Sequence, residues 1–218
     1  MPTIKAAQIF WRWFMNNENA YLNFENIKDD EQNSLLEELY AELKKYSKDL
    51  GFSLSFTHGP LPALIFTAKG NADLFEDVMF LIHHAPESDK WNFVSFIPQT
   101  EVPGEFTYQD IVVSPDDIYF TARRNWKRLG LLDLTLYVRA SKDTVQSEEL
   151  INTAILLLLH LLGEANFAAC IGTFSVQEMP ADPSKKRLRK LRELPEFAST
   201  RNVIKKLIPA MERQGIVV

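Results

Sequence analysis

Apolar positions recur every three or four residues in two N-terminal segments, which predicts two amphipathic helices. The second of these helices begins near Asp29, where Asp29 and Gln32 resemble a capping box, and it ends before Gly51. The apolar stripe of the first helix is rich in aromatic side chains and consists of Ala6, Ile9, Phe10, Trp13 and Phe14. We expect the protein's own core to cover this stripe.

The apolar period then changes to two, which is typical of strands. Strands are predicted over 52–56 and 63–68, and Gly70-Asn71 begins a third helix that runs to His83-His84 before Pro86. Residues 91–98 are apolar on both faces and predict an interior strand. Further strands are predicted over 111–113, 118–122 and 131–138.

A long apolar helix over 144–162, with Asp143 and Gln146 at its capped start, is followed by a last predicted strand over 167–179. This order of elements predicts an α+β fold with a mainly antiparallel sheet and helices packed on it. The segments 63–98 and 131–179 each read strand-helix-strand, which would suit a ferredoxin-like core with added N-terminal helices and a C-terminal extension.

The composition is that of an ordinary globular protein and excludes collagen-like, disulfide-rich and wholly disordered chains. The single cysteine, Cys170, lies in an apolar stretch, which favours a reducing compartment and a cytoplasmic location. The longest apolar run, 155–162, is too short to span a membrane, and the N-terminus lacks the features of a secretion signal. The sequence indicates no metal and no cofactor.

The net charge of -5 conceals a strong asymmetry. Residues 184–213 contain ten Lys or Arg against three Glu, so the rest of the chain is acidic. We expect residues 1–180 to form a single α+β domain and 181–218 a basic extension with a short helix over 203–211. The extension either docks on its own acidic body or binds nucleic acid, phosphate or an acidic partner.

The common phosphate, dinucleotide, zinc-protease and serine-hydrolase motifs are absent from the sequence. Glu164 is the first candidate catalytic residue, because a carboxylate after Gly163 at the end of an apolar helix is electrostatically disfavoured and needs water or a donor. His83 and His84 are candidate partners, although adjacent histidines at a helix end also serve as favourable cations there. A hydrolase-like enzyme would pair Glu164 with one of these histidines as acid and base.

A second candidate is a basic loop around Trp126, in which four cations and an indole could bind phosphates and stack a base. The alternative is a solvated loop whose Trp126 packs on the core. The residues predicted for binding are Arg123, Arg124, Trp126, Lys127 and Arg128 of this loop, with Lys185, Lys186 and Arg187 of the extension.

Several short stretches resemble the pattern of an uncharacterised bacterial domain family, a domain-of-unknown-function type. The stretches are Phe66-Thr67-Ala68-Lys69-Gly70-Asn71, Phe75, Ala85-Pro86, Trp91-Asn92-Phe93-Val94-Ser95-Phe96-Ile97-Pro98 and Leu162-Gly163-Glu164. The resemblance implies a bacterial cytoplasmic protein with a similar α+β domain, and it implies no activity.

Three functions remain as hypotheses. The acidic body and the lack of a catalytic constellation favour a non-catalytic protein-binding or regulatory module in a bacterial cytoplasm, with another protein as partner and no membrane. The first alternative is the hydrolase-like enzyme. The second alternative is nucleic-acid binding through residues 123–128 and 185–206. The sequence leans away from an enzyme and assigns no oligomeric state.

Overall fold

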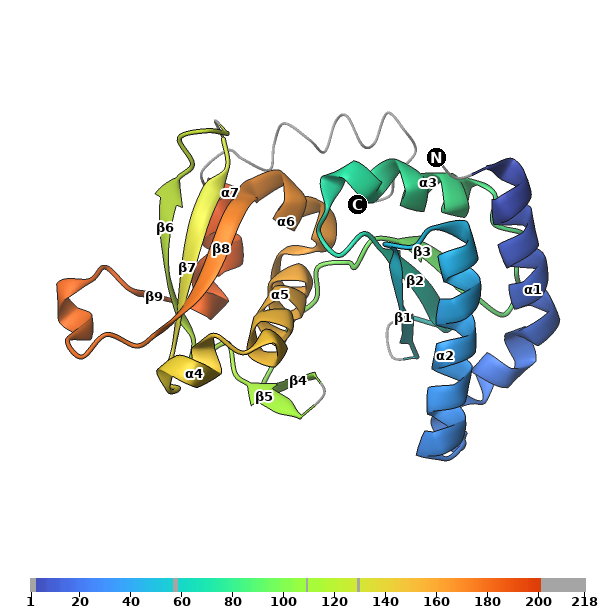
Figure 1. The fold of residues 1–218 in the computed structure, drawn as a ribbon, viewed down its shortest axis with the longest axis horizontal. Coiled ribbons are helices and arrows are strands. Elements are labelled where there is room, and N and C mark those ends of the chain that lie inside the picture. Colours follow the sequence, from blue (N-terminus) through green and yellow to red (C-terminus); the bar gives the residue numbers. More distant parts are fainter. Residues whose placement is uncertain (1–2, 57–58, 109, 129, 201–218) are drawn as a thin grey trace. The chain divides into compact units, whose positions relative to one another are not determined.

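We describe the chain from a computed structural model, which covers residues 3–56, 59–108, 110–128 and 130–200 (Figure 1). Internal contacts divide the chain into two compact units, Met1–Ile97 and Pro98–Val218. The sequence predicts a single domain over 1–180, with its boundary at 180 rather than at 97, and this stays a prediction. The helix predicted over 203–211 lies outside the described residues.

The first unit contains a three-stranded sheet with the order β1-β2-β3. Strand β1 runs antiparallel to β2, and β3 runs parallel to it. Strand β2 is buried at all five positions, as a central strand requires. The prediction of an interior strand over 91–98 is wrong, because β3 is shorter and lies at the sheet edge. The elements are α1 (Ile4–Leu22), α2 (Asp29–Tyr46), β1 (Gly51–Ser55), β2 (Ala63–Thr67), α3 (Phe75–His83) and β3 (Asn92–Ser95).

Helix α1 packs an aromatic face into the core of this unit, but the face is rotated from the predicted one. Ile9 is 48% exposed, whereas Trp11 is buried and its indole Nε1 donates to the carbonyl of Leu81 at 2.8 Å. Trp11 can therefore satisfy its polar atom inside an apolar core. The buried side chains are Ala7, Phe10, Trp11, Phe14, Glu18 and Tyr21.

The helix starts of the first unit follow the sequence only in part. Lys28 precedes α2 without a side-chain cap, and the side-chain Nε2 of Gln32 donates to the carbonyl of Phe24 at 2.8 Å, so the predicted capping box does not form. Asn71 does cap a 3₁₀ turn before α3, accepting from the Asp73 amide at 3.1 Å.

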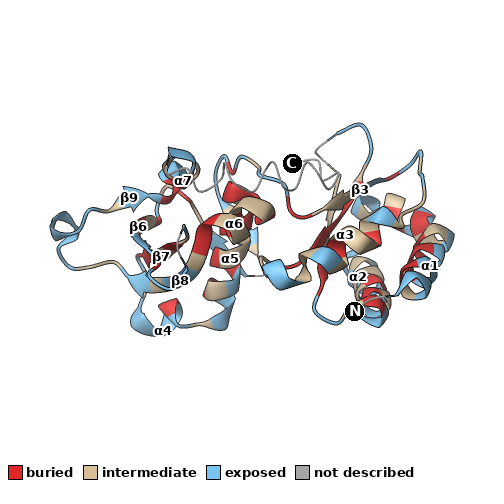
Figure 2. Cartoon of the chain, turned by 90° about the horizontal axis from the view of Figure 1, so that it is seen from above, coloured by how far each residue is buried: buried red, intermediate tan, exposed pale blue. Residues whose placement is uncertain are grey.

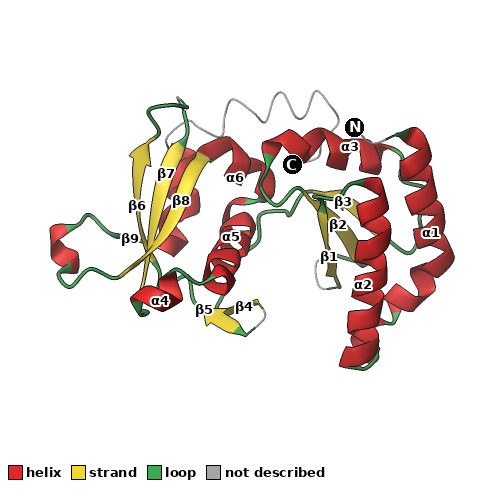
Figure 3. Ribbon diagram, in the orientation of Figure 1, coloured by secondary structure: helices red, strands yellow, loops and turns green. Residues whose placement is uncertain are grey.

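The second unit contains a two-stranded hairpin of β4 and β5 and a four-stranded sheet with the order β8-β7-β6-β9 (Figure 3). Strand β6 runs antiparallel to β7 and β9, and β8 runs parallel to β7. The elements are β4 (Phe106–Tyr108), β5 (Ile111–Val113), β6 (Tyr119–Arg124), β7 (Leu132–Val138), α4 (Lys142–Val145), α5 (Glu148–Leu162), α6 (Glu164–Cys170), β8 (Ile171–Glu178), β9 (Arg189–Lys190) and α7 (Leu194–Thr200).

The four-stranded sheet has one apolar and one polar face. Leu132, Leu134 and Leu136 are buried along β7, as the alternation predicts. Thr121 and Arg123 of β6 pair across the ladder with Thr135 and Asp133, so these four side chains share the opposite face. Figure 2 shows buried positions on the strands and on α5, and exposed positions around β9.

The helical part of the second unit departs from the prediction at two places. The predicted helix over 144–162 is two helices, α4 and α5, capped by Ser141 and Ser147. Residues 167–170 belong to α6 rather than to a strand. The chain turns at Gly163 just before α6; φ is +74° there and a Cβ would lie 3.0 Å from the Gln99 amide nitrogen, so the position requires glycine. Among the described residues, no single helix is long and apolar enough to cross a membrane; α5 and α6 reach that composition only together, across a bend of 103°.

The α+β class with mostly antiparallel sheets is confirmed. The segments 63–98 and 131–179 do connect parallel strands, β2 to β3 and β7 to β8. The described strands form no ferredoxin-like core. In that fold another strand lies between the two parallel strands of each strand-helix-strand segment, whereas here β2 pairs directly with β3 and β7 with β8.

Candidate nucleic-acid interface

Residues 189–200 of the basic extension pack on the second unit, whereas residues 181–187 are exposed. Strand β9 pairs with Tyr119 and Phe120 at the start of β6. Leu191 and Leu194 are fully buried. Arg192 donates to both carboxylate oxygens of Asp116 at 2.8 and 2.7 Å, which holds the pKa of Asp116 below its usual value.

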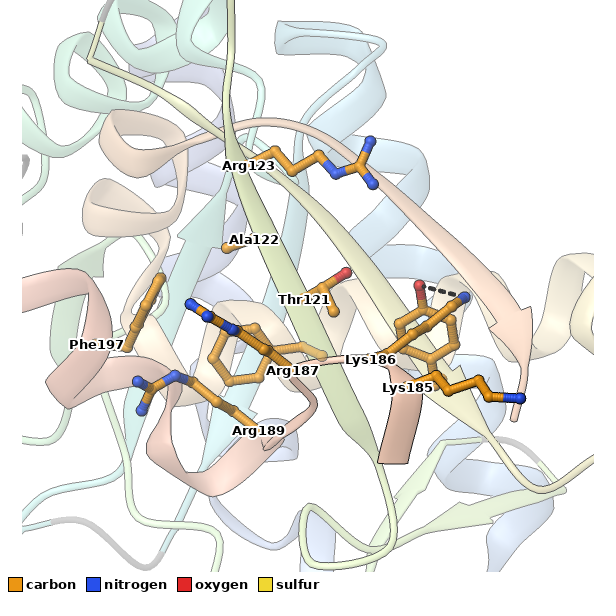
Figure 4. A pocket seen from close by; sticks show the side chains of 10 residues that line it. Thr121, Ala122, Arg123, Lys185, Lys186, Arg187, Arg189 and Phe197 are labelled. Atoms are coloured by element: carbon orange, nitrogen blue, oxygen red, sulfur yellow. Dashed lines mark hydrogen bonds between the residues drawn. The ribbon is translucent and has the colours of Figure 1, made fainter. Parts of the chain in front are cut away.

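This docking creates a pocket of about 510 Å³ beside β6 (Figure 4). In Figure 4, Arg187 and Arg189 point to the Phe197 side of β6, whereas Arg123, Lys185 and Lys186 point to the other side. The pocket therefore spans the edge of the strand and receives side chains from both segments predicted for binding. Its lining consists of Phe120, Thr121, Ala122, Arg123, Tyr137, Lys185, Lys186, Arg187, Arg189 and Phe197.

The charge of this pocket is positive, since five lining residues are Lys or Arg and none is acidic. Carboxylates outside the lining offset two of these cations: Asp182 lies 3.1 Å from Lys185, and Glu193 lies 3.3 Å from Arg189. Within the described part of the chain, Arg123, Lys186 and Arg187 make no ion pair. The lining of the pocket thus carries a net positive charge, which favours an anion.

Tyr137 responds to this positive charge. Lys186 Nζ donates to its hydroxyl at 3.2 Å and lies 4.5 Å from the ring centre. Burial raises the pKa of Tyr137, but hydrogen bonds from Thr121 and Lys186, with the charges of Lys186 and Arg123, outweigh burial and leave the pKa below its usual value. The pocket therefore favours negative charge even on its own tyrosine.

The turn from β6 to β7 is held by Asn125, which is only 8% exposed. Its side-chain oxygen accepts from the amides of Lys127 and Arg128 at 2.9 and 2.7 Å, and its Nδ2 donates to Asp133 at 2.7 Å. This Asx turn fixes the backbone of the loop that carries the predicted binding residues.

Trp126 is 92% exposed, so the expectation that it packs on the core is wrong. The buried Asn125 occupies the inward position and directs the next residue outward. Arg124, Lys127 and Arg128 are also exposed. An indole held in water between cations can stack on a planar ligand whose charge these cations neutralise.

Glu164 is fully buried, and its surroundings differ from those predicted. Gly163 ends α5 and directly precedes α6, so Glu164 is the first residue of a new helix. A carboxylate at that end is favoured by the helix dipole, so the argument for an electrostatically disfavoured acid is wrong. Its proposed catalytic role stays a prediction.

The histidines at the end of α3 have local contacts. His84 directly follows α3 as its C-cap, and its Nδ1 is 2.8 Å from the carbonyl oxygen of Phe80. His83 is exposed, with its ring centre 5.2 Å from that of His84. Both belong to the first unit and Glu164 to the second, so the acid–base pair of the enzyme hypothesis stays a prediction. The described residues contain no cluster of three or more His, Cys, Asp or Glu that could hold a metal.

Sequence reasoning missed four residues of the pocket, Phe120, Thr121, Ala122 and Tyr137, while Arg189 and Phe197 fall within the predicted range 185–206 without having been singled out. The alternation of β7 contains a signal for Tyr137, because successive side chains of a strand point to opposite faces, so Tyr137 shares the face of Asp133 and Thr135. The pairing of β9 with β6 carries no such signal, since a two-residue strand has no recognisable period.

Comparison of the chain with protein-family models, with curated proteins and with solved structures finds no match in any of the three. The resemblance to an uncharacterised bacterial domain family, with the bacterial origin that it implies, stays a prediction.

Proposed function

We propose that the second unit binds single-stranded nucleic acid along β6. The observation that carries this proposal is that Arg123, from one predicted binding segment, and Lys185–Arg187, from the other, line the same pocket. Convergence of cations from distant segments on one surface is typical of a phosphate-binding site.

The strand edge adds backbone groups to these cations. Strand β9 pairs only with Tyr119 and Phe120, and no other described strand pairs with Thr121–Arg124 on that side. The open edge offers amide donors, which bind phosphate oxygens and bases in many nucleic-acid complexes.

Trp126 favours nucleic acid over an acidic peptide as the ligand. An extended peptide that adds to a strand edge is recognised through pockets for alternate side chains. An indole exposed to water instead matches the stacking platforms that bind unpaired bases. The sequence favoured the hypothesis of a protein-binding or regulatory module. Among the described residues, no contact supports that hypothesis in the way that Trp126 supports nucleic-acid binding.

We keep the cytoplasm as the location of this function. Cys170 is buried, and burial raises its thiol pKa to about 11, so it suits a structural thiol of a reducing compartment.

The test is fluorescence anisotropy of a labelled single-stranded oligonucleotide, roughly ten nucleotides long, titrated with the full chain at several salt concentrations. The wild-type affinity should fall as salt rises. The triple variant Arg123→Ala, Lys186→Ala, Arg187→Ala should reduce the slope of log affinity against log salt by about two. Trp126→Ala should weaken binding with little change in that slope.

A matched control removes three exposed cations of the first unit, Lys5, Arg12 and Lys48, and so gives the same net charge. Equal binding by the two triple variants would contradict the proposal. Competition with polyglutamate of the same charge distinguishes nucleic acid from acidic proteins as the ligand. If polyglutamate displaced the labelled oligonucleotide as effectively as the unlabelled oligonucleotide does, the surface would be assigned to acidic proteins.

A further inference from the structure

We infer that the pocket beside β6 binds the terminal phosphate of a nucleic-acid strand, so that the protein recognises an end rather than any internal segment. This inference rests on the proposed function and adds the position at which the bound strand stops.

The first argument is geometric. A strand bound along β6 from Trp126 follows the open edge over Arg124–Thr121 and then reaches Phe120. There β9 occupies the edge by pairing with Phe120 and Tyr119, and the chain leading into β9 carries Lys185, Lys186 and Arg187 across it (Figure 4). The path along the edge is therefore closed at the pocket.

The second argument is electrostatic. A terminal phosphate monoester carries a charge of about -1.5 to -2 at pH 7, against one negative charge for each internal phosphate. Four cations line the pocket at the closed end, namely Lys185, Lys186, Arg187 and Arg189, and Lys186 and Arg187 make no ion pair among the described residues. The additional negative charge of a terminal phosphate is therefore stabilised most strongly at the closed end.

The third argument is the size and chemistry of the pocket. Its volume of about 510 Å³ lies in the range of small-ligand sites, so it has room for a terminal nucleotide together with its phosphate. Phe120, Tyr137 and Phe197 add ring surface beside the cations, and the Tyr137 hydroxyl is an additional hydrogen-bonding group.

The experiment compares three oligonucleotides of one sequence, which carry a 5′-phosphate, a 3′-phosphate or hydroxyls at both ends. Binding to the full chain is measured by competition against one labelled strand. One phosphate-ended form should bind about tenfold more tightly than the hydroxyl-ended form. Arg187→Ala should remove this difference, whereas Trp126→Ala should weaken all three forms by the same factor.

Arg187 is exposed and Arg139 is an exposed arginine elsewhere in the same unit, so Arg139→Ala is the control and should keep the difference. Equal affinities of the three oligonucleotides for the wild type would overturn end recognition and leave the proposed function standing. A preference that survives Arg187→Ala would also overturn it. Failure of every oligonucleotide to bind would overturn the proposed function and this inference with it.

Discussion

The three-stranded sheet of the first unit and the four-stranded sheet of the second unit use their strands differently. In the first unit, the central strand β2 is buried at every position and is surrounded by aromatic side chains from α1, among them Phe10 and Trp11, which contact Phe66. In the second unit, β6 is buried at Phe120 and exposed at Arg123 and Arg124. A strand that packs on both faces has no surface left for a ligand, whereas a strand with a polar face and an open edge has one. We therefore expect the first sheet to serve mainly stability and the second to carry the proposed binding surface.

The largest effect should come from breaking the aromatic core of the first unit. Trp11→Ala removes a buried side chain and leaves the Leu81 carbonyl without its indole donor, so we expect a loss of about 3–5 kcal/mol in unfolding free energy. Urea denaturation followed by circular dichroism measures this loss. Ile9→Ala, on the exposed side of α1, is the control and should change stability little; equal losses for the two variants would refute the assigned core face.

An intermediate effect should come from Gly172 of β8, which lies beside Asn125 in the turn that carries Trp126. A Cβ at this position would lie 2.7 Å from Asn125 Nδ2 and 3.2 Å from Asp133 Oδ1. Gly172→Ala should therefore cost about 1–3 kcal/mol and weaken oligonucleotide binding, because the loop carrying Trp126 loses its support. Gly104→Ala is the control, since no atom lies within 4 Å of its Cβ position. Unchanged binding by Gly172→Ala would argue against a fixed loop.

The pKa values of tyrosines in the two units are shifted in opposite directions. Burial, with nearby carboxylates, raises the pKa of Tyr21 and of Tyr46 in the first unit, whereas the cations lower that of Tyr137. Tyr21 and Tyr46 thus contribute stability below the ordinary pKa of about 10, lost as pH rises through their folded values. Tyr137 contributes stability above pH 10, lost as pH falls through its folded value.

An alkaline titration followed by ultraviolet difference absorbance measures these shifts. The first tyrosine to ionise should move to higher pH in Lys186→Met, while Tyr46→Phe should leave it in place. If the pH of the first tyrosine ionisation were the same in Lys186→Met as in the wild type, the proposed positive field at Tyr137 would be contradicted.

The smallest effect should come from the loop tip. Lys127→Ala should leave stability unchanged and reduce the salt slope of oligonucleotide binding by about 0.7, as expected for one phosphate contact. Lys142→Ala, in α4, serves as the control, and the same change in both variants would remove the loop from the interface.

The sequence was sufficient for the α+β class and for most strands, because alternation of the kind seen from Leu132 to Val138 depends on local burial alone. It placed the end of α5 at Gly163 but missed α6, because residues 167–170 continue into the apolar stretch of β8 and were assigned to that strand. It named Arg123 and Lys185–Arg187 as binding residues but had no means to join them, since their meeting depends on the pairing of β9 with β6.

The exposure of Trp126 has a practical consequence for the study of this molecule. Trp11 and Trp91 are enclosed by other side chains and Trp13 is half-buried, so only one of the four indoles stands almost wholly in solvent. Its red-shifted emission is separable from that of the others, and iodide ions attracted by the adjacent cations should quench it selectively. The loop therefore carries an intrinsic optical reporter, and occupancy of this surface can be followed without attaching any dye to the protein.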